Sequence, residues 1–257
     1  MRISSVLSMA LVASAALLGA AQAQSSGEPV SQSLAPAVTE GEYGSASAYA
    51  WAGIWFSNHY VGGYGGAIKA LNETDDLWSD GWVLRFDVSG GDYRYDSIGF
   101  TDIRVGTLDT DVMVGYRKKI DKGTFSAYIG PSYAFHHNPD PAADIHGTEF
   151  GARILADYVA PLDDGVDGYV QGSYSTAFST YSLAGRLLFR VSDTVWIGPQ
   201  ATLFGNNAPY QESTFGPVLK INTNFGEIGF SGGYRHVFTS GNPDGYFASA
   251  YLGLPIE

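Results

Sequence analysis

Residues 147–159 read Gly-Thr-Glu-Phe-Gly-Ala-Arg-Ile-Leu-Ala-Asp-Tyr-Val, and the alternation within this stretch decides the fold. One set of alternate positions is apolar and contains Phe150, Ala152, Ile154, Ala156 and Tyr158. The opposite set contains Glu149, Gly151, Arg153 and Asp157. Because successive side chains of a β-strand point to opposite faces, this stretch predicts a strand with one apolar and one polar face.

The same alternation recurs in other stretches, where charges again occupy the polar face in mid-strand. Arg85 lies within 81–92, Arg186 within 180–190 and Arg235 within 225–237. In each segment Gly or Ser shares the face that carries the arginine. A solvated face of a secreted β-sandwich, the alternative fold, usually carries more Lys, Glu and Thr. Charges among glycines favour a membrane barrel whose apolar face turns to lipid and whose polar face fills a crowded lumen.

We count about twelve alternating segments separated by clusters of Gly, Asn, Asp and Pro. They are 47–57, 60–70, 81–92, 106–118, 123–135, 147–159, 166–177, 180–190, 194–204, 212–222, 225–237 and 245–253. Helical periodicity is missing beyond two turns, and no apolar run after the N-terminal region is long enough for a membrane helix. The prediction is an all-β chain forming an antiparallel transmembrane β-barrel of about twelve strands, with ten to fourteen compatible.

Connection lengths support a barrel and also locate its weakest point. Membrane barrels alternate short periplasmic turns with longer outer loops, and most connections here follow that rule. The connection at 58–59 is too tight for an outer loop, and 71–80 is too long for an inner turn. The first two strands are therefore the least fixed by the sequence.

Aromatic and glycine positions give two further expectations. Aromatic residues near segment ends are assigned to interfacial girdles, namely Tyr49, Tyr60, Tyr133, Tyr158, Tyr181 and Phe204. Glycines such as Gly62, Gly66 and Gly229 are expected to permit curvature or close packing against a bulky neighbour. The ending at 254–257, Leu-Pro-Ile-Glu, departs from the aromatic ending common in outer-membrane barrels.

Composition excludes several classes of function. The chain has 257 residues with Gly 33, 45% hydrophobic, 14% aromatic and 16% charged residues. A formal net charge of -12 argues against nucleic acid as a partner, which requires a basic surface. With Cys 0, disulfides, thiolate chemistry and cysteine zinc sites are excluded.

The N-terminal residues are predicted to be a targeting sequence rather than part of the fold. Met1-Arg2, an apolar stretch at 6–21 and Ala21-Gln22-Ala23 match a secretory signal peptide over 1–23. Residues 24–46 are rich in Ser, Gln, Pro and Glu and predict a flexible periplasmic lead-in to a barrel over 47–257. The expected location is the outer membrane of a Gram-negative bacterium.

Several motifs, in matching order, resemble the bacterial cellulose biosynthesis protein BcsS family. They are Asp-Val-Met-Val-Gly-Tyr at 111–116, Ala-Tyr-Ile-Gly at 127–130, Gly-Thr-Glu-Phe-Gly at 147–151, Gly-Ser-Tyr-Ser-Thr-Ala-Phe at 172–178 followed by Thr-Tyr at 180–181, Ile-Gly-Pro at 197–199 and Gly-Gly-Tyr at 232–234. The resemblance covers about 50–253. It implies an envelope protein associated with cellulose synthesis and export, and no catalytic residues are carried over from it.

An enzyme is the main alternative class. His136, His137 and His146 lie in or beside one outer loop near serines such as Ser132, which raises a lipid-modifying hydrolase of barrel type. No nucleophile-elbow context accompanies them, so the expectation is no enzyme. The same histidines with Asp140 or Asp144 make a weak metal candidate, and we expect no metal and no cofactor.

A glycosidase would require two carboxylates across a sugar bond, and Glu149, Asp157 and Glu227 share the polar face. Arginines on the same face favour a structural ion-pair ladder instead. The predicted lumen-lining residues are Arg85, Asp87, Asp111, Arg117, Glu149, Arg153, Arg186, Glu227 and Arg235. The expected function is an accessory of cellulose or exopolysaccharide secretion, as conduit or scaffold. Its expected partners are outer-membrane lipid, cellulose synthase complex subunits and glucan chains.

Overall fold

The structure is a computed structural model that describes residues 45–257 apart from 59, 98–99, 141–142, 144, 207–209 and 239–242. The predicted signal peptide and most of the lead-in lie outside the described residues. The strands are β1 (Ala48–Ser57), β2 (Tyr60–Ala70), β3 (Gly81–Ser97), β4 (Phe100–Ile120), β5 (Gly123–His137), β6 (Gly147–Asp163), β7 (Val166–Ser175), β8 (Tyr181–Arg190), β9 (Val195–Gly205), β10 (Gln211–Thr223), β11 (Gly226–Val237) and β12 (Gly245–Ile256), with a short 3₁₀ helix η1 (Ala177–Ser179).

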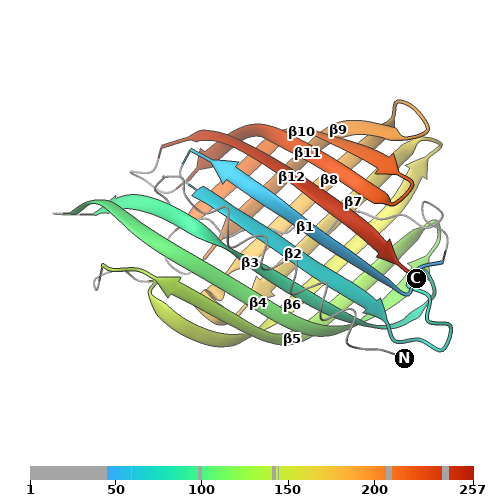
Figure 1. Ribbon diagram of the computed structural model, residues 1–257, viewed down its shortest axis with the longest axis horizontal. Helices are drawn as coiled ribbons and strands as arrows, with labels where there is room; N and C mark the ends of the chain where they lie inside the picture. Colours follow the sequence, from blue (N-terminus) through green and yellow to red (C-terminus); the bar gives the residue numbers. More distant parts are fainter. Residues whose placement is uncertain are drawn as a thin grey trace.

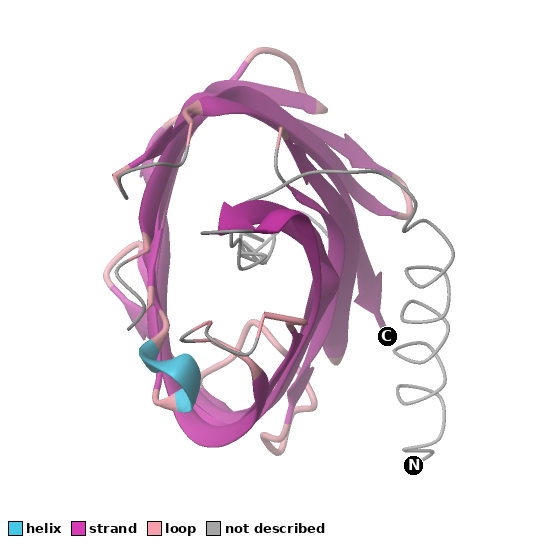
Figure 2. Cartoon of the chain, turned by 90° about the vertical axis from the view of Figure 1, so that its left-hand side faces the viewer, coloured by secondary structure: helices cyan, strands magenta, loops and turns pink. Residues whose placement is uncertain are grey.

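The strands form one closed barrel in which each pairs with its neighbours in sequence and β1 pairs with β12. All pairings are antiparallel. The tilted wall is visible in Figure 1, and the end-on view in Figure 2 shows the closed ring. The predicted all-β barrel is confirmed, including its first two strands. Within the described part of the chain, no helix has the length and hydropathy needed for a membrane span.

The polar and apolar faces of the strands separate as the alternation predicts. In β6, Phe150 is 77% exposed and Ile154 52% exposed, whereas Leu155 between the polar positions is buried. In β3, Arg85 and Asp87 are buried while Leu84 is exposed. The apolar set therefore faces outward, and the charged set faces the lumen.

The barrel has two different ends. We call the end that holds residue 48 and the C-terminus the terminal end, and the opposite one the loop end. At the loop end, β3 and β4 extend past their neighbours, since β4 has 21 residues against 11 in β2. This extension projects at the left of Figure 1.

The long connection at 71–80 has a tertiary explanation. Leu77 and Trp78 are buried in a cluster with residues of β1 and β2, and the Leu77 N–H donates to the Ala46 carbonyl over 2.8 Å. Asn72 and Asp76 hold the turn, because Asn72 Oδ1 accepts from the Asp76 N–H at 3.1 Å and Asp76 Oδ1 from the Trp78 N–H at 3.1 Å. The connection is long because it folds back over the terminal end.

The last strand runs further than the alternation predicts. β12 was expected to end at 253, but its ladder with β1 continues to Ile256, with Pro255 opposite Tyr49. The ladder between β11 and β12 ends at Gly253, so Pro255 has only one neighbouring strand. A proline lacks a backbone donor, and this one-sided position tolerates that loss.

The girdle assignment is wrong for three of its six residues. Tyr49, Tyr60 and Phe204 are buried at strand ends, on the lumen side of the wall. Strand-end position alone led to the error, because Tyr49 shares its face with the buried Trp51 rather than with the exposed Ile54. These large rings occupy space inside the barrel, whose interior is wide enough to hold them.

Glycines beside these rings are confirmed as close-packing sites. A Cβ at Gly66 would lie 2.4 Å from Trp51 Cζ2, and one at Gly62 would lie 2.0 Å from the Tyr60 hydroxyl. At Gly229 a Cβ would lie 1.9 Å from Cε1 of Tyr251, the residue directly opposite on β12. Because glycine has no side chain, a neighbouring aromatic ring can occupy the space beside each of these residues.

Replacing Gly229 with Ala should therefore displace the Tyr251 ring and lower the free energy of unfolding by about 1–3 kcal/mol. Urea unfolding of the refolded barrel, followed by tryptophan fluorescence, measures the change. Gly185→Ala is the matched control, because a Cβ there meets nothing closer than the Tyr169 carbonyl at 3.9 Å. Equal stabilities of the two variants would contradict the packing argument.

Candidate functional site

The terminal end of the lumen is filled by aromatic rings and one arginine. Trp78, from the folded-back connection, lies under the Arg117 guanidinium, 5.5 Å from the ring centroid. Tyr49, Trp51 and Tyr128 are buried beside it. A cavity of about 50 Å³ remains among these rings, which is room for a water or two and not for a sugar.

The middle of the lumen is crossed by a charged cluster centred on Arg85 of β3. Arg85 Nε donates to Asp87 Oδ2 at 2.7 Å, and its Nη2 donates to Asp87 Oδ1 at 3.1 Å. Its Nη1 lies 3.7 Å from Asp157 Oδ2 on β6, which is three strands away around the wall. The guanidinium also lies 5.2 Å from the ring centroids of both Trp51 and Tyr128. Arg85 therefore ties two sides of the barrel together through the lumen.

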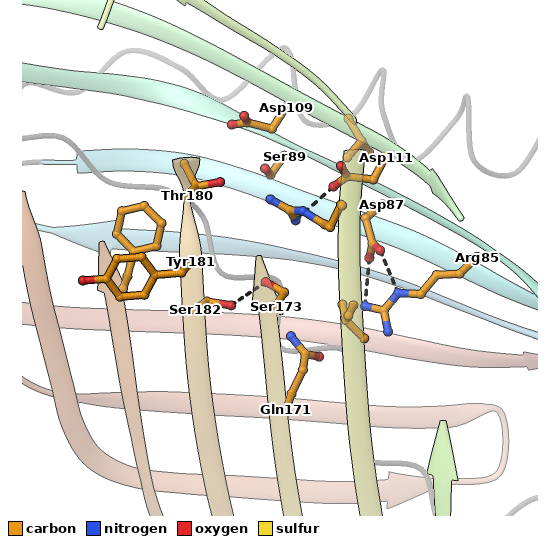
Figure 3. A pocket seen from close by; sticks show the side chains of 14 residues that line it. Arg85, Asp87, Ser89, Asp109, Asp111, Gln171, Ser173, Thr180, Tyr181 and Ser182 are labelled. Atoms are coloured by element: carbon orange, nitrogen blue, oxygen red, sulfur yellow. Dashed lines mark hydrogen bonds and ion pairs between the residues drawn. The ribbon is translucent and has the colours of Figure 1, made fainter. Parts of the chain in front are cut away.

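A small polar cavity borders this cluster toward the loop end (Figure 3). Its volume is about 30 Å³, and its lining includes Asp109, Asp111, Gln171, Ser173 and Ser182. Arg153 Nη1 contacts Asp111 Oδ2 at 2.9 Å, and the hydroxyls of Ser173 and Ser182 are 2.8 Å apart. Hydroxyl, amide and carboxylate groups are sugar-binding chemistry, yet this volume holds about one water molecule.

A second charged group lies on β10 and β11. Arg235 Nε donates to Glu212 Oε2 at 2.6 Å, and Tyr210 OH donates to the same oxygen at 2.6 Å. Burial and the adjacent Glu212 carboxylate raise the pKa of Tyr210, which precedes β10, well above its ordinary value. Lys220 Nζ lies 3.8 Å from Glu227 Oε2, and both side chains are 0% exposed. Removing either member of this buried pair would be strongly destabilising, because the charge left behind would lose its partner.

At the loop end, η1 packs against residues of β5 and β6. The Phe178 N–H donates to Glu149 Oε2 at 2.6 Å, and the Phe178 ring lies 4.9 Å from the His136 ring. The residue Gly151 leaves room for this segment, since a Cβ there would lie 2.5 Å from the Ala177 nitrogen. The Gly-Ser-Tyr-Ser-Thr-Ala-Phe motif at 172–178 therefore ends β7 and begins η1.

The nine predicted lumen residues fall into different surroundings. Arg85, Asp87, Asp111 and Arg153 belong to the central cluster, and Glu227 and Arg235 belong to the β10–β11 group. Glu149 holds η1, and Arg117 covers Trp78. Arg186 has no ion pair with any described carboxylate; it lies 5.9 Å from the Tyr251 ring centroid. Whether these residues line a conducting path stays a prediction.

Sequence reasoning missed several lumen charges. Glu212 and Lys220 are buried on β10, and Asp109 borders the central cluster. Asp157, which also borders that cluster, had been placed on the polar face of its strand but not among the lumen-lining residues. The alternation could have identified Glu212 and Lys220. Both occupy even positions of their segment, on the opposite face from Phe215 and Leu219. Pro217 and Gly216 in the same segment obscured it.

The histidines do not assemble a hydrolase site among the described residues. The Ser132 hydroxyl pairs with that of Ser175 at 3.0 Å, while the buried His136 ring packs against Phe178 and Tyr93. His137 faces the other side of the wall and stacks on Phe135. Within the described chain no group of three metal-ligating side chains is present. The three glycosidase candidates, Glu149, Asp157 and Glu227, belong to three separate contacts.

One exposed hydrogen-bond cluster lies at the loop end outside the lumen. The Asp244 carboxylate accepts from the Tyr234 hydroxyl, from His236 Nδ1 at 2.8 Å and from the Val237 N–H at 2.9 Å. These three donors stabilise the charged form and lower the pKa of Asp244 to about 2. The cluster closes the connection between β11 and β12.

The closed wall, outward apolar face and polar lumen define an outer-membrane type of β-barrel. The family model of the cellulose biosynthesis protein BcsS matches residues 49–256. The chain belongs to this cellulose biosynthesis protein family, which agrees with the resemblance found in its motifs.

Solved structures with a similar barrel include a porin and two autotransporter domains. The KdgM porin in complex with disordered oligogalacturonate has a TM-score of 0.48 and 10% identity, covering 81% of this chain and 99% of the porin. The beta domain of the Bordetella autotransporter BrkA has a TM-score of 0.46 and 10% identity, covering 83% and 100%. The translocator domain of the autotransporter NalP from Neisseria meningitidis has a TM-score of 0.41 and 11% identity, covering 83% and 88%. No curated relative matches the sequence.

Breaking the central cluster should destabilise the barrel. Arg85→Met leaves the Asp87 and Asp157 carboxylates without their buried partner, and we expect the free energy of unfolding to fall by about 3–5 kcal/mol. Arg85→Met combined with Asp87→Asn should recover part of that loss. Urea unfolding measures both, with Arg190→Gln as control, because its pair with Asp164 is exposed and worth less than about 1 kcal/mol. If the destabilisation of the double variant equalled the sum of those of Arg85→Met and Asp87→Asn, direct coupling between Arg85 and Asp87 would be contradicted.

Proposed function

We propose that this protein is an outer-membrane barrel that serves cellulose biosynthesis as a closed scaffold rather than as an open glucan conduit. The single observation that carries the proposal is the burial of the lumen-facing charges. Arg85, Arg235, Lys220 and Glu227 are each at most 2% exposed. In an open pore these side chains would be in contact with water.

Three levels of the lumen support the closed state. Trp78 and its neighbours fill the terminal end, the Arg85 cluster crosses the middle, and Phe178 with His136 covers part of the loop end. A glucan chain would have to displace interlocked ion pairs at the middle level. Removing one member of such a pair is costly, so passage through the resting barrel is unfavourable.

The expected placement puts the terminal end in the periplasm and the exposed apolar positions in lipid. Residues 1–23 are proposed to direct export, and residues 24–46 to extend into the periplasm. There the lead-in and the acidic turn at 71–80, with Glu73, Asp75 and Asp80, would meet subunits of the cellulose synthase complex. The proposed role is to hold that machinery at the membrane through which the polymer leaves.

A conductance measurement separates scaffold from conduit. We expect the refolded chain to be silent in planar bilayers, with or without cello-oligosaccharides, because its lumen is filled. Heat-modifiable migration in gel electrophoresis verifies the folded barrel, and a porin in the same bilayer verifies the recording. Steady conductance that cello-oligosaccharides block would instead establish a glucan conduit.

A co-purification measurement tests the scaffold directly. We expect cellulose synthase subunits to be recovered with the full chain after cross-linking in cells, and to be lost when residues 24–44 are deleted. His137→Ala, at the opposite end of the barrel, is the control and should retain them. Recovery of no subunit with the full chain would overturn the scaffold role, and retention by the deletion variant would exclude the lead-in as the docking segment.

A further inference from the structure

Arg186 on β8 carries a buried positive charge that no carboxylate of the described residues neutralises. Its side chain faces the lumen and is 5% exposed. Nε and Nη1 are both buried and donate to no protein acceptor in the described part of the chain. The Tyr251 ring centroid, 5.9 Å from the guanidinium carbon, gives it a cation–π contact. Two buried N–H donors and one full charge therefore still need an acceptor and a counter-charge.

The other cations of the lumen differ from Arg186 in having a carboxylate partner. Their ion pairs are Arg85–Asp87 at 2.7 Å, Arg153–Asp111 at 2.9 Å, Arg235–Glu212 at 2.6 Å and Lys220–Glu227 at 3.8 Å. The charge of Arg117 acts on the Asp157 carboxylate. Burial is thus common to the lumen cations, and the missing anion is particular to Arg186.

The groups around the Arg186 guanidinium are polar but neutral. Its charge acts on the hydroxyls of Tyr169, which is opposite it on β7, and of Tyr64 and Tyr251, which approach from across the lumen. Gln200 is directly opposite Arg186 on β9, is 3% exposed, and its Oε1 accepts from no described donor. Hydroxyl and amide groups can hydrogen-bond an ion, but they do not cancel a charge.

The wall beyond Gln200 offers no side chain that could supply the charge. Gly216 of β10 is opposite Gln200, and it lies between the buried positions Thr214 and Val218. A Cβ on Gly216 would lie 2.8 Å from the Cα of Gly233, so the next inward position, on β11, is also a glycine. A counter-charge at this level of the lumen therefore has to come from solution.

Burial and charge together define the kind of ligand. The small exposed fractions of Arg186 and Gln200 leave room for an occupant about the size of a water molecule or a monatomic ion. A water molecule would satisfy the N–H donors but not the charge. A buried charge is costly unless it is paired, and the attraction between opposite charges grows as the surroundings become less polar. A small monovalent anion supplies both the acceptor and the counter-charge.

We propose that Arg186 binds a chloride ion inside the lumen. In this site Gln200 turns its amide so that Nε2 donates to the ion, and the Tyr64 and Tyr251 hydroxyls border it. The ion would be the partner that carboxylates provide for the other lumen cations. The site concerns one buried charge and not the scaffold role, and its test requires no cellulose synthase subunit.

Urea unfolding of the refolded full chain in two salts tests the site. The salts are sodium chloride and sodium gluconate at equal ionic strength, because gluconate is too large for the space beside Arg186. At a chloride concentration about ten times the dissociation constant, we expect the unfolding equilibrium constant to be about tenfold lower than in gluconate. Arg190→Gln is the control and should keep this difference, since Arg190 is exposed and pairs with Asp164.

Arg186→Met gives a change of sign that a packing role would not give. Without the guanidinium, unfolding should be the same in both salts. The variant should be at least as stable as the original chain in gluconate, because an unpaired charge is removed, and less stable in chloride. If the variant were destabilised by the same factor in both salts, Arg186 would contribute packing only and the site would be overturned. An original chain indifferent to the anion would overturn it as well.

Bromide locates the ion directly and does not depend on the variant folding. In crystals of the full chain containing sodium bromide, we expect an anomalous scattering peak within hydrogen-bonding distance of the Arg186 guanidinium. Crystals of Arg190→Gln should show the same peak, and those of Arg186→Met should lack it. An ordered water molecule at Arg186 without anomalous signal would contradict the proposal, whatever the unfolding measurements gave.

Discussion

The rest of the structure depends on the side chains that strand alternation places inside a twelve-stranded barrel. Strand alternation sends every second side chain inward, and the lipid-facing positions take the apolar ones. The inward positions then bring charged groups into a confined space, where burial without a partner is costly. The barrel meets this constraint with long arginines whose guanidinium groups reach acids on other strands, as Arg85 reaches Asp157, and whose flat faces lie on rings. Removal of an arginine would therefore affect both a charge pair and a packing contact.

Glycine and aromatic residues pack against one another in this barrel. A ring such as Tyr251 covers the backbone of the opposite Gly229, and Trp51 covers Gly66 in the same way. This pairing accounts for part of the high share of both residue types. It also places rings such as Tyr49 and Tyr60 inside the wall, whereas sequence reasoning had assigned them to the membrane interface.

How much the sequence could predict depended on the range of the interaction. Strand positions were predicted because alternation and turn residues are local, and Arg85 or Glu227 could be given a face by counting positions. The girdle error at Tyr49 came from using strand ends without parity. The contact of Arg85 with Asp157, the hold of Glu149 on Phe178 and the inward fold of Trp78 join segments far apart in the chain, so no local pattern contained them.

The largest buried apolar cluster has a consequence for the seam at which the barrel closes. Its members come from the segment before β1, from β1 through β6 and from the connection at 71–80, with Tyr251 alone from the C-terminal strands. Tyr251 is therefore the one residue through which this cluster reaches across the seam between β12 and β1. The seam is held by side-chain packing inside the wall as well as by the backbone ladder, so opening β12 from β1 would also expose apolar surface of the first six strands.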